Sequence, residues 1–172
     1  MFRTAYLAAV AVLVMAAPMS AARAQNCATT GADANWSGCG YAGSDMRGAR
    51  AEGGNLARTK FKLVDLRSAR FARADLTQAS FDAVDLRSAD FTAAKLADAS
   101  FKATDLRSAR LDGADLRDAV IDTCDLRSAS LRGANLTGAR FVLTNYRETD
   151  FSGATWLDGK KICGEASIGI CR

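Results

Sequence analysis

The sequence predicts an all-β solenoid, and three observations lead to that prediction. From Leu56 to Trp156 a large apolar residue occupies every fifth position. Helices return a side chain to one face every 3.6 residues and strands every 2, so a period of five requires a chain that bends sharply and regularly. A small or β-branched residue stands two positions before each large one, and the motif Asp-Leu-Arg-Ser-Ala recurs every 20 residues from Asp65 to Asp125. Four five-residue units therefore make one repeating layer.

The five-residue unit also resembles a known family. Its form is Ala-Asp/Asn-Leu-x-x, as in Ala74-Asp75-Leu76, Ala114-Asp115-Leu116 and Ala134-Asn135-Leu136. This unit resembles the pentapeptide repeat family, and the centres from Met46 to Trp156 give 23 units, of which only Ala51 lacks a large centre. The resemblance implies a right-handed quadrilateral β-helix of about six stacked 20-residue coils. In that fold the large and the small residue of each unit point inward and the other three point outward.

The first residues have the three-part form of a secretory signal. Arg3 is basic, residues 5–17 are apolar, and the small-residue site Ala22-Arg23-Ala24 follows. The alternative is a membrane anchor, but the apolar run is shorter than the ~20 residues that span a bilayer. We therefore expect a signal peptide at 1–24, an N-terminal cap at 25–43, a pentapeptide-repeat β-helix at 44–158 and a C-terminal cap at 159–172. The mature protein would be exported, to the periplasm or outside the cell.

Five cysteines in a chain that is expected to be exported favour disulfide bonds. Cys27 and Cys39 precede the regular repeats, while Cys163 and Cys171 follow them. Each pair can close a short loop over one end of the stack, so we expect the local pairs Cys27–Cys39 and Cys163–Cys171. Cys124 holds the small-residue position of its unit, and we interpret it as a small buried side chain.

Both ends of a solenoid expose an apolar cross-section and open strand edges, and both need caps. At the start of the chain Trp36 and Tyr41, together with the first cysteine pair, are the candidates. At the other end we expect Trp156 and residues 157–172 to act as the cap. The tail from Trp156 to Gly159, followed by two cysteines, is similar to the ending of exported bacterial members of the family.

The 20-residue register also sorts the charged residues into columns. Like charges about 4.8 Å apart in water repel by roughly 1 kcal/mol per neighbouring pair, so a column of one sign needs an opposite column beside it. We interpret one side of the rod as a self-neutralising surface with an arginine column at Arg47, Arg67, Arg87, Arg107, Arg127 and Arg147 and an aspartate column at Asp45, Asp65, Asp85, Asp105 and Asp125.

The side centred on Phe61 and the residues 20, 40, 60 and 80 positions later is expected to be basic. In strict register it carries only two carboxylates, those of Asp82 and Asp122. The cations of this candidate binding face are Lys60, Lys62, Lys102, Arg140, Lys160 and Lys161. Such a stripe on an exported protein would attract anionic lipid headgroups, surface polysaccharide or an acidic protein. An ordinary solvated face is the alternative interpretation.

The composition argues against catalysis. The chain has no histidine, which is the usual general base and the commonest metal ligand. Its outward aspartates alternate with Arg or Ser and do not converge, and there is no glycine-rich phosphate loop and no Cys-x-x-Cys motif. We therefore expect no enzyme activity, no cofactor and no bound metal ion.

Two functions remain, and charge separates them. The first is an exported structural or interaction protein that presents rigid faces to a protein or an envelope component, with peripheral membrane contact as one form of binding. The second follows from a subset of the family that resembles DNA in shape and charge and engages type II topoisomerases in the cytoplasm. Without Arg3 and Arg23 the mature chain has 21 basic and 19 acidic residues, a net charge of +2, whereas a DNA mimic should be strongly acidic. We expect no nucleic acid partner, and the oligomeric state is left open.

Overall fold

The computed structural model describes Cys27, residues 30–31 and residues 34–172. The expected signal peptide at 1–24 lies outside the described residues, as does part of the expected N-terminal cap. Within the described part of the chain there is no helix, and hence none long and apolar enough to cross a membrane. The chain forms six short strands: β1 (Gly40–Ala42), β2 (Lys60–Lys62), β3 (Ser80–Asp82), β4 (Ser100–Lys102), β5 (Val120–Asp122) and β6 (Arg140–Val142).

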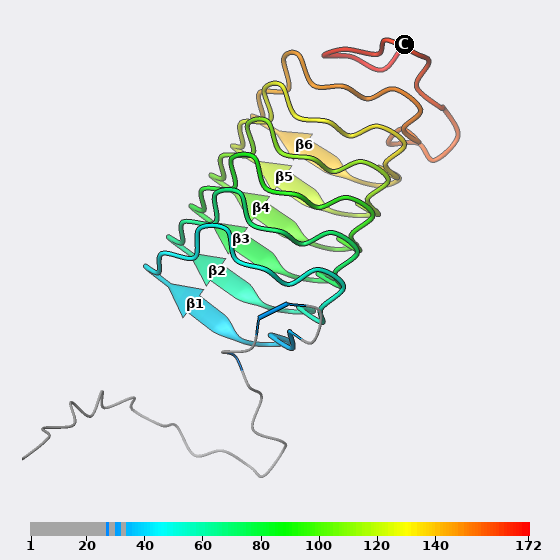
Figure 1. The fold of residues 1–172 in the computed structure, drawn as a ribbon. Coiled ribbons are helices and arrows are strands. Elements are labelled where there is room, and N and C mark those ends of the chain that lie inside the picture. The colour runs from blue at the N-terminus through cyan, green and yellow to red at the C-terminus, as the bar shows by residue number, and fades with distance from the viewer. Residues whose placement is uncertain (1–26, 28–29, 32–33) are drawn as a thin grey trace, which may run out of the picture.

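The six strands form one parallel sheet in chain order, and they run along one side of a rod (Figure 1). Every pairing is offset by 20 residues, so that Phe61 lies opposite Phe81 and Phe81 opposite Phe101. The other three sides are held by single parallel bridges with the same offset, such as Asp65 with Asp85. The predicted all-β solenoid with a 20-residue coil is therefore confirmed.

A tight turn in every five-residue unit produces the corners of the coil. On three of the four sides the carbonyl of the centre accepts a hydrogen bond from the amide three residues later, as in Ala69 N–H to Leu66 O at 3.0 Å. The residue between them that completes the turn has a positive φ, which is 64° at Gly113 but also 56° at Ser68. A left-handed backbone costs a non-glycine residue about 1 to 2 kcal/mol. Ser68 is held there because its amide also donates to Arg87 O in the next coil, at 2.9 Å.

The core is a set of stacked columns, one for each side of the coil. The large centre and the small residue of each unit are buried from Leu56 to Leu136, as the family resemblance implies. On the strand side the rings of Phe61, Phe81 and Phe101 stack nearly parallel, with centroids 5.1 and 4.7 Å apart. Each buried centre contributes roughly 1.5 to 3 kcal/mol, largely offset by the entropy of ordering the chain.

At the N-terminal end the ladder begins earlier than the repeat segment expected from residue 44. Asn35 already forms a parallel bridge with Asn55, and β1 pairs in register with β2. Trp36 is therefore the first inward centre and is 1% exposed. A disulfide joins Cys27 to Cys39.

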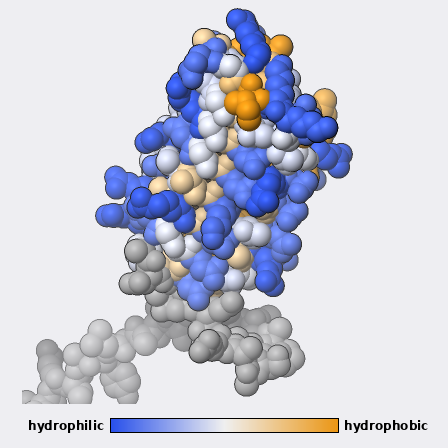
Figure 2. Space-filling model, turned by 90° about the vertical axis from the view of Figure 1, so that its right-hand side faces the viewer, coloured by the Kyte–Doolittle hydropathy of each residue, from blue (hydrophilic) through white to orange (hydrophobic). Residues whose placement is uncertain are grey.

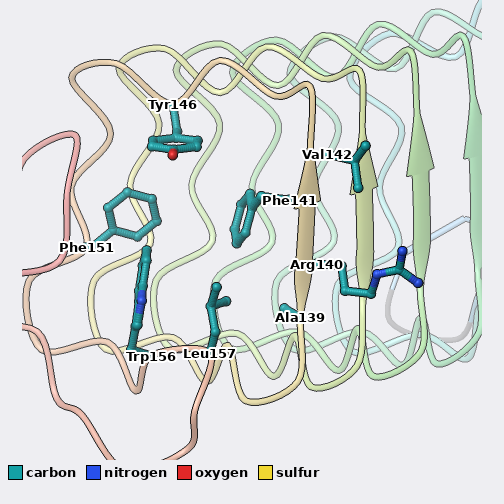
Figure 3. Close-up of a pocket in the computed structure, with 8 residues that line it drawn as sticks. All are labelled: Ala139, Arg140, Phe141, Val142, Tyr146, Phe151, Trp156 and Leu157. Carbon is teal, nitrogen blue, oxygen red and sulfur yellow. The ribbon is translucent and has the colours of Figure 1, made fainter.

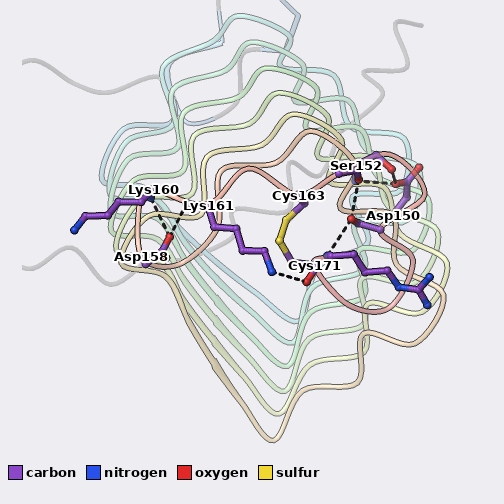
Figure 4. The surroundings of a disulfide bond; sticks show 10 residues. Asp150, Ser152, Asp158, Lys160, Lys161, Cys163 and Cys171 are labelled. Carbon is purple, nitrogen blue, oxygen red and sulfur yellow. Dashed lines mark hydrogen bonds between the residues drawn. A yellow bond between two sulfur atoms is a disulfide. The ribbon is translucent and has the colours of Figure 1, made fainter.

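At the C-terminal end the chain leaves the coil after Leu157 and folds back on itself. Two antiparallel bridges mark this reversal, Thr155 with Ile162 and Asp150 with Ile168. A disulfide joins Cys163 to Cys171 within the returning segment. Figure 4, which looks along the stack of coils, shows this segment crossing only part of the last coil. We call residues 158–172 the C-terminal cap.

Candidate functional site

The arginine and aspartate columns neutralise each other in a repeated geometry. The Arg87 guanidinium donates to both carboxylate oxygens of Asp85, with Nη2 to Oδ2 at 2.6 Å and Nε to Oδ1 at 2.9 Å. Its Nε also lies 3.7 Å from Oδ2 of Asp105 in the next coil. Hydrogen bonds from Arg87 hold the pKa of the Asp85 carboxyl below its usual value. The same pairing recurs in the coils of Arg47, Arg67 and Arg107, which fits a self-neutralising surface.

The sheet side of the rod, here called the strand face, carries four of the six predicted cations. Lys60 and Lys62 lie on β2, Lys102 on β4 and Arg140 on β6, and all four side chains are exposed. Lys62 and Lys102 stand in one column, in the order Lys62, Asp82, Lys102 and Asp122. Basic and acidic residues therefore alternate along that column.

The structure does not place Lys160 and Lys161 on the strand face. Strict 20-residue register would put them above Arg140 and Phe141, but the chain has already reversed, and Thr155 pairs antiparallel with Ile162. Lys161 instead donates from Nζ to the Cys171 carbonyl at 3.1 Å within the C-terminal cap (Figure 4). The expectation that both lysines extend the basic side is wrong because the register ends where the cap begins.

An apolar pocket of about 380 Å³ opens at the C-terminal end of the rod. Its walls are Phe141, Tyr146, Phe151, Trp156 and Leu157, with Arg140 and Val142 on the rim (Figure 3). The Phe141 and Tyr146 ring centroids are 5.9 Å apart, and those of Phe151 and Trp156 are 5.3 Å apart, both pairs edge to face. These rings are the end of the aromatic core, and all of them except Phe151 are partly exposed to solvent.

Exposed apolar side chains gather at the same end, where Figure 2 shows apolar colour near the upper end of the molecule. Among the described residues, the large apolar side chains that are exposed at this end are Val142, Leu143, Tyr146, Ile162, Ile168 and Ile170, and one other, Leu63, lies elsewhere. Sequence reasoning missed this patch. The available signal was that Val142 and Leu143 fill outward positions that hold Asp122 and Thr123 one coil earlier.

The described surface shows no constellation suited to bond chemistry. In the part of the chain that the structure describes, no three His, Cys, Asp or Glu side chains gather where they could hold a metal ion. The Cys124 thiol is 3% exposed, and burial raises its pKa to about 11. A thiol in that state is a poor nucleophile at neutral pH. The described residues carry instead the charged columns and the apolar pocket.

Comparison with known proteins places this geometry in a family. The family model described as pentapeptide repeats matches eight copies, over residues 44–82, 85–121 and 124–155, which is more than half of the chain. The chain belongs to the pentapeptide repeat family. Comparison with the curated proteins gives no match.

Solved structures of other pentapeptide repeat proteins resemble this one. The structure of Rfr23 from the cyanobacterium Cyanothece 51142 is 24% identical, with 71% of this chain and 90% of that chain covered and a TM-score of 0.53. A thylakoid lumen protein of Arabidopsis thaliana is 27% identical, with coverages of 74% and 83% and a TM-score of 0.36. QnrB1, a plasmid-mediated fluoroquinolone resistance protein, is 22% identical, with coverages of 70% and 64% and a TM-score of 0.39. The similarity to Rfr23 shows a shared fold.

Proposed function

We propose that this pentapeptide repeat protein is an exported, non-catalytic interaction protein whose strand face binds an anionic component of the cell envelope. The observation that carries the proposal is a contrast between two sides of the rod. The arginines at 67, 87 and 107 are each engaged by two carboxylates. Within the described residues, no carboxylate forms an ion pair with the four cations of the strand face, Lys60, Lys62, Lys102 and Arg140.

The fold supports this proposal because it fixes the spacing of the charges. Lys60 and Arg140 are four register steps apart, which corresponds to about 19 Å at ~4.8 Å per step. Their backbones are already ordered by the sheet, so binding costs only side-chain freedom. Asp82 and Asp122 reduce the positive charge of the face, which favours a diffuse anionic surface over one compact anion.

Export is supported by the N-terminal pattern and by the two disulfides of the structure, since disulfides persist in oxidising compartments. Cell fractionation combined with N-terminal sequencing tests this part of the proposal. We expect a chain that begins after Ala24 and is found outside the cytoplasm. An uncleaved chain in the cytoplasm would contradict export and would favour the alternative function, binding to a type II topoisomerase.

The binding part is tested by retention of the mature protein on vesicles that contain phosphatidylglycerol. Changing Lys60, Lys62, Lys102 and Arg140 together to Gln should lower retention at least tenfold, because each basic residue near an anionic surface contributes about 1 kcal/mol. The matched control changes Arg47, Arg67, Arg87 and Arg107 to Gln. It removes the same number of charges from the side that carries the arginine and aspartate columns. The proposal would be contradicted if vesicle retention did not fall with increasing salt concentration, or if it fell equally in both variants.

A further inference from the structure

The last strand of the sheet has an open side. The C-terminal cap covers the last coil from Thr149 to Trp156, through hydrogen bonds such as Phe151 N–H to Ser167 O at 2.9 Å and Trp156 N–H to Lys161 O at 2.7 Å. It stops short of β6, which is the terminal strand of the sheet. A strand edge with unused backbone groups is a template for another chain.

The unused groups can be identified from the coil below. There, the Ala119 carbonyl accepts from Arg140 N–H at 2.9 Å, and Thr123 N–H donates to Val142 O at 2.8 Å. The corresponding groups one coil later are the Ala139 carbonyl and the Leu143 amide. Within the described part of the chain neither forms a hydrogen bond. Both are therefore placed to pair with one more parallel strand.

The apolar pocket lies where the middle residue of that strand would point. In the lower coils each middle residue turns inward and packs on the one before it, as Phe101 does on Phe81. The pocket continues this column beyond Phe141, with Tyr146 and Trp156 as its walls (Figure 3). Its volume of about 380 Å³ falls within the range of ligand pockets, roughly 300 to 1,000 Å³. An aromatic middle residue would fit inside it.

The rim of the pocket defines the neighbours of that aromatic residue. In parallel register the residue before it would lie over Arg140 and the residue after it over Val142, as Val120 and Asp122 do on the other side of β6. Among the described residues Arg140 and Arg147 form no ion pair, and Arg147 follows Asn145 where earlier coils have Asp. An acidic residue before the ring and an apolar one after it therefore match the edge.

We propose that the open C-terminal edge binds an extended segment of another protein as a seventh parallel strand, with the sequence acidic, aromatic, apolar. The aromatic ring enters the pocket, the acidic side chain pairs with Arg140, and the backbone bonds to Ala139 O and Leu143 N–H. This mode of recognition gains affinity from main-chain hydrogen bonds and specificity from alternate side chains. A second copy of the chain fits less well. Two C-terminal ends would bring the Arg140 side chains of both copies together, and the N-terminal end of a second copy has its Trp36 ring buried and its Tyr41 hydroxyl bonded to the Cys27 carbonyl.

The test measures binding of a fluorescent peptide with the core Ser-Glu-Phe-Val-Thr to the mature protein by fluorescence anisotropy. Arg140→Glu should weaken binding at least tenfold, and a peptide with Lys in place of Glu should restore it. Methylating the Glu nitrogen of the peptide removes the donor to Ala139 O and should also abolish binding. Methylating the Phe nitrogen is the matched control, because alternate amides of a strand point to opposite neighbours.

Tyr146→Ala separates this proposal from the vesicle-binding proposal. Tyr146 is a wall of the pocket and is 39% exposed, so this variant should stay folded in a thermal melt. It should weaken peptide binding at least tenfold, because the pocket loses one wall, and it should keep vesicle retention, because no charge changes. The proposal is overturned if no peptide binds, if both methylated peptides bind alike, or if charge reversal is not rescued. Self-association in sedimentation equilibrium that excess peptide does not reverse would assign the edge to a second copy.

Discussion

The two ends of the rod are built from the same repeat and differ in how far their terminal apolar side chains are covered. At the N-terminal end Trp36 is 1% exposed and packs edge to face with Tyr41 and Phe71, with centroids 5.5 and 6.2 Å away. At the C-terminal end Tyr146 is 39% exposed and Leu143 86% exposed. The repeat itself does not decide whether a solenoid end is closed; the path of the flanking segment does.

Hydrogen bonds show where each flanking segment attaches. At the N-terminal end the Tyr41 hydroxyl donates to the Cys27 carbonyl at 2.6 Å, so the segment is tied to the strand side of the coil. At the C-terminal end the cap bonds to the backbone of Thr149, Phe151 and Trp156 and leaves β6 uncovered. The flanking segment is thus attached to the strand side at one end and leaves it open at the other, where the pocket lies.

Truncating one aromatic residue at each end should show the largest difference between the two ends. Trp36→Ala should lower the free energy of unfolding by roughly 3 to 5 kcal/mol, because it empties a fully buried site. Tyr146→Ala should cost about 1 kcal/mol, since that ring is already partly solvated. Urea denaturation of both variants gives the difference. Equal losses would show that the two ends are closed to the same degree.

Removing each disulfide tests the two caps separately. The Cys27–Cys39 and Cys163–Cys171 bonds span 12 and 8 residues, and each should contribute about 2 to 3 kcal/mol by restricting the unfolded chain. The double Cys→Ser variant at each end should show this loss in thermal melts. Mass spectrometry after non-reducing digestion checks the pairing first. A link from Cys27 to Cys171, or any disulfide of Cys124, would contradict the assignment.

The coils could be predicted from the sequence because every coil has the same neighbours above and below. Leu66 and Phe81 meet the environment that the register assigns to them, since a strict period repeats both the turn and the inward position. The alternation of Lys62, Asp82 and Lys102 was also readable from that register. A sum of the charges over a whole side hides such alternation.

The C-terminal end could not be predicted in the same way. Past Leu157 no periodic pattern constrains the chain, and the antiparallel pairing of Thr155 with Ile162 depends on backbone groups that carry no sequence signal. For the same reason the register misplaced Lys160 and Lys161. The pocket beside Phe141 exists because the cap stops short of β6, which only the hydrogen bonds of the cap reveal.

Cys124 offers a probe of how firmly the open end stays folded. It lies one coil below that end, and its pKa is raised to about 11 by burial, from an ordinary value near 9.0. At pH 8 the thiolate fraction should be about 100-fold lower than in a peptide, so alkylation by iodoacetamide should be at least that much slower. Rapid alkylation without global unfolding would show that the last coil opens locally.

The same thiol predicts a loss of stability in alkali, with a defined sign. The pKa of Cys124 is higher in the folded state than in the unfolded state. The contribution of the protonated thiol to the free energy of unfolding is therefore complete below pH 9 and is lost as the pH rises through about 11. Cys124→Val, which copies the residue at Val64 and Val84 in this column, removes the effect. Near pH 10.5 the free energy of unfolding of the wild type should have fallen by roughly 2 kcal/mol more than that of the variant. Parallel pH profiles would contradict the burial of the thiol.

The smallest expected effect compares an arginine inside the charge columns with one at the open end. Arg87→Ala should cost under ~1 kcal/mol at neutral pH, because exposed ion pairs stabilise little even with bidentate geometry. Arg147→Ala should cost nothing measurable, since Asn145 replaces the carboxylate of its unit. The cost of Arg87→Ala should vanish as the pH falls through the lowered folded pKa of Asp85, because protonation removes the partner charge. Thermal melts at pH 7 and at a series of decreasing acid pH values would show this, and an equal cost for both arginines at pH 7 would mean that the columns do not stabilise the rod through charge.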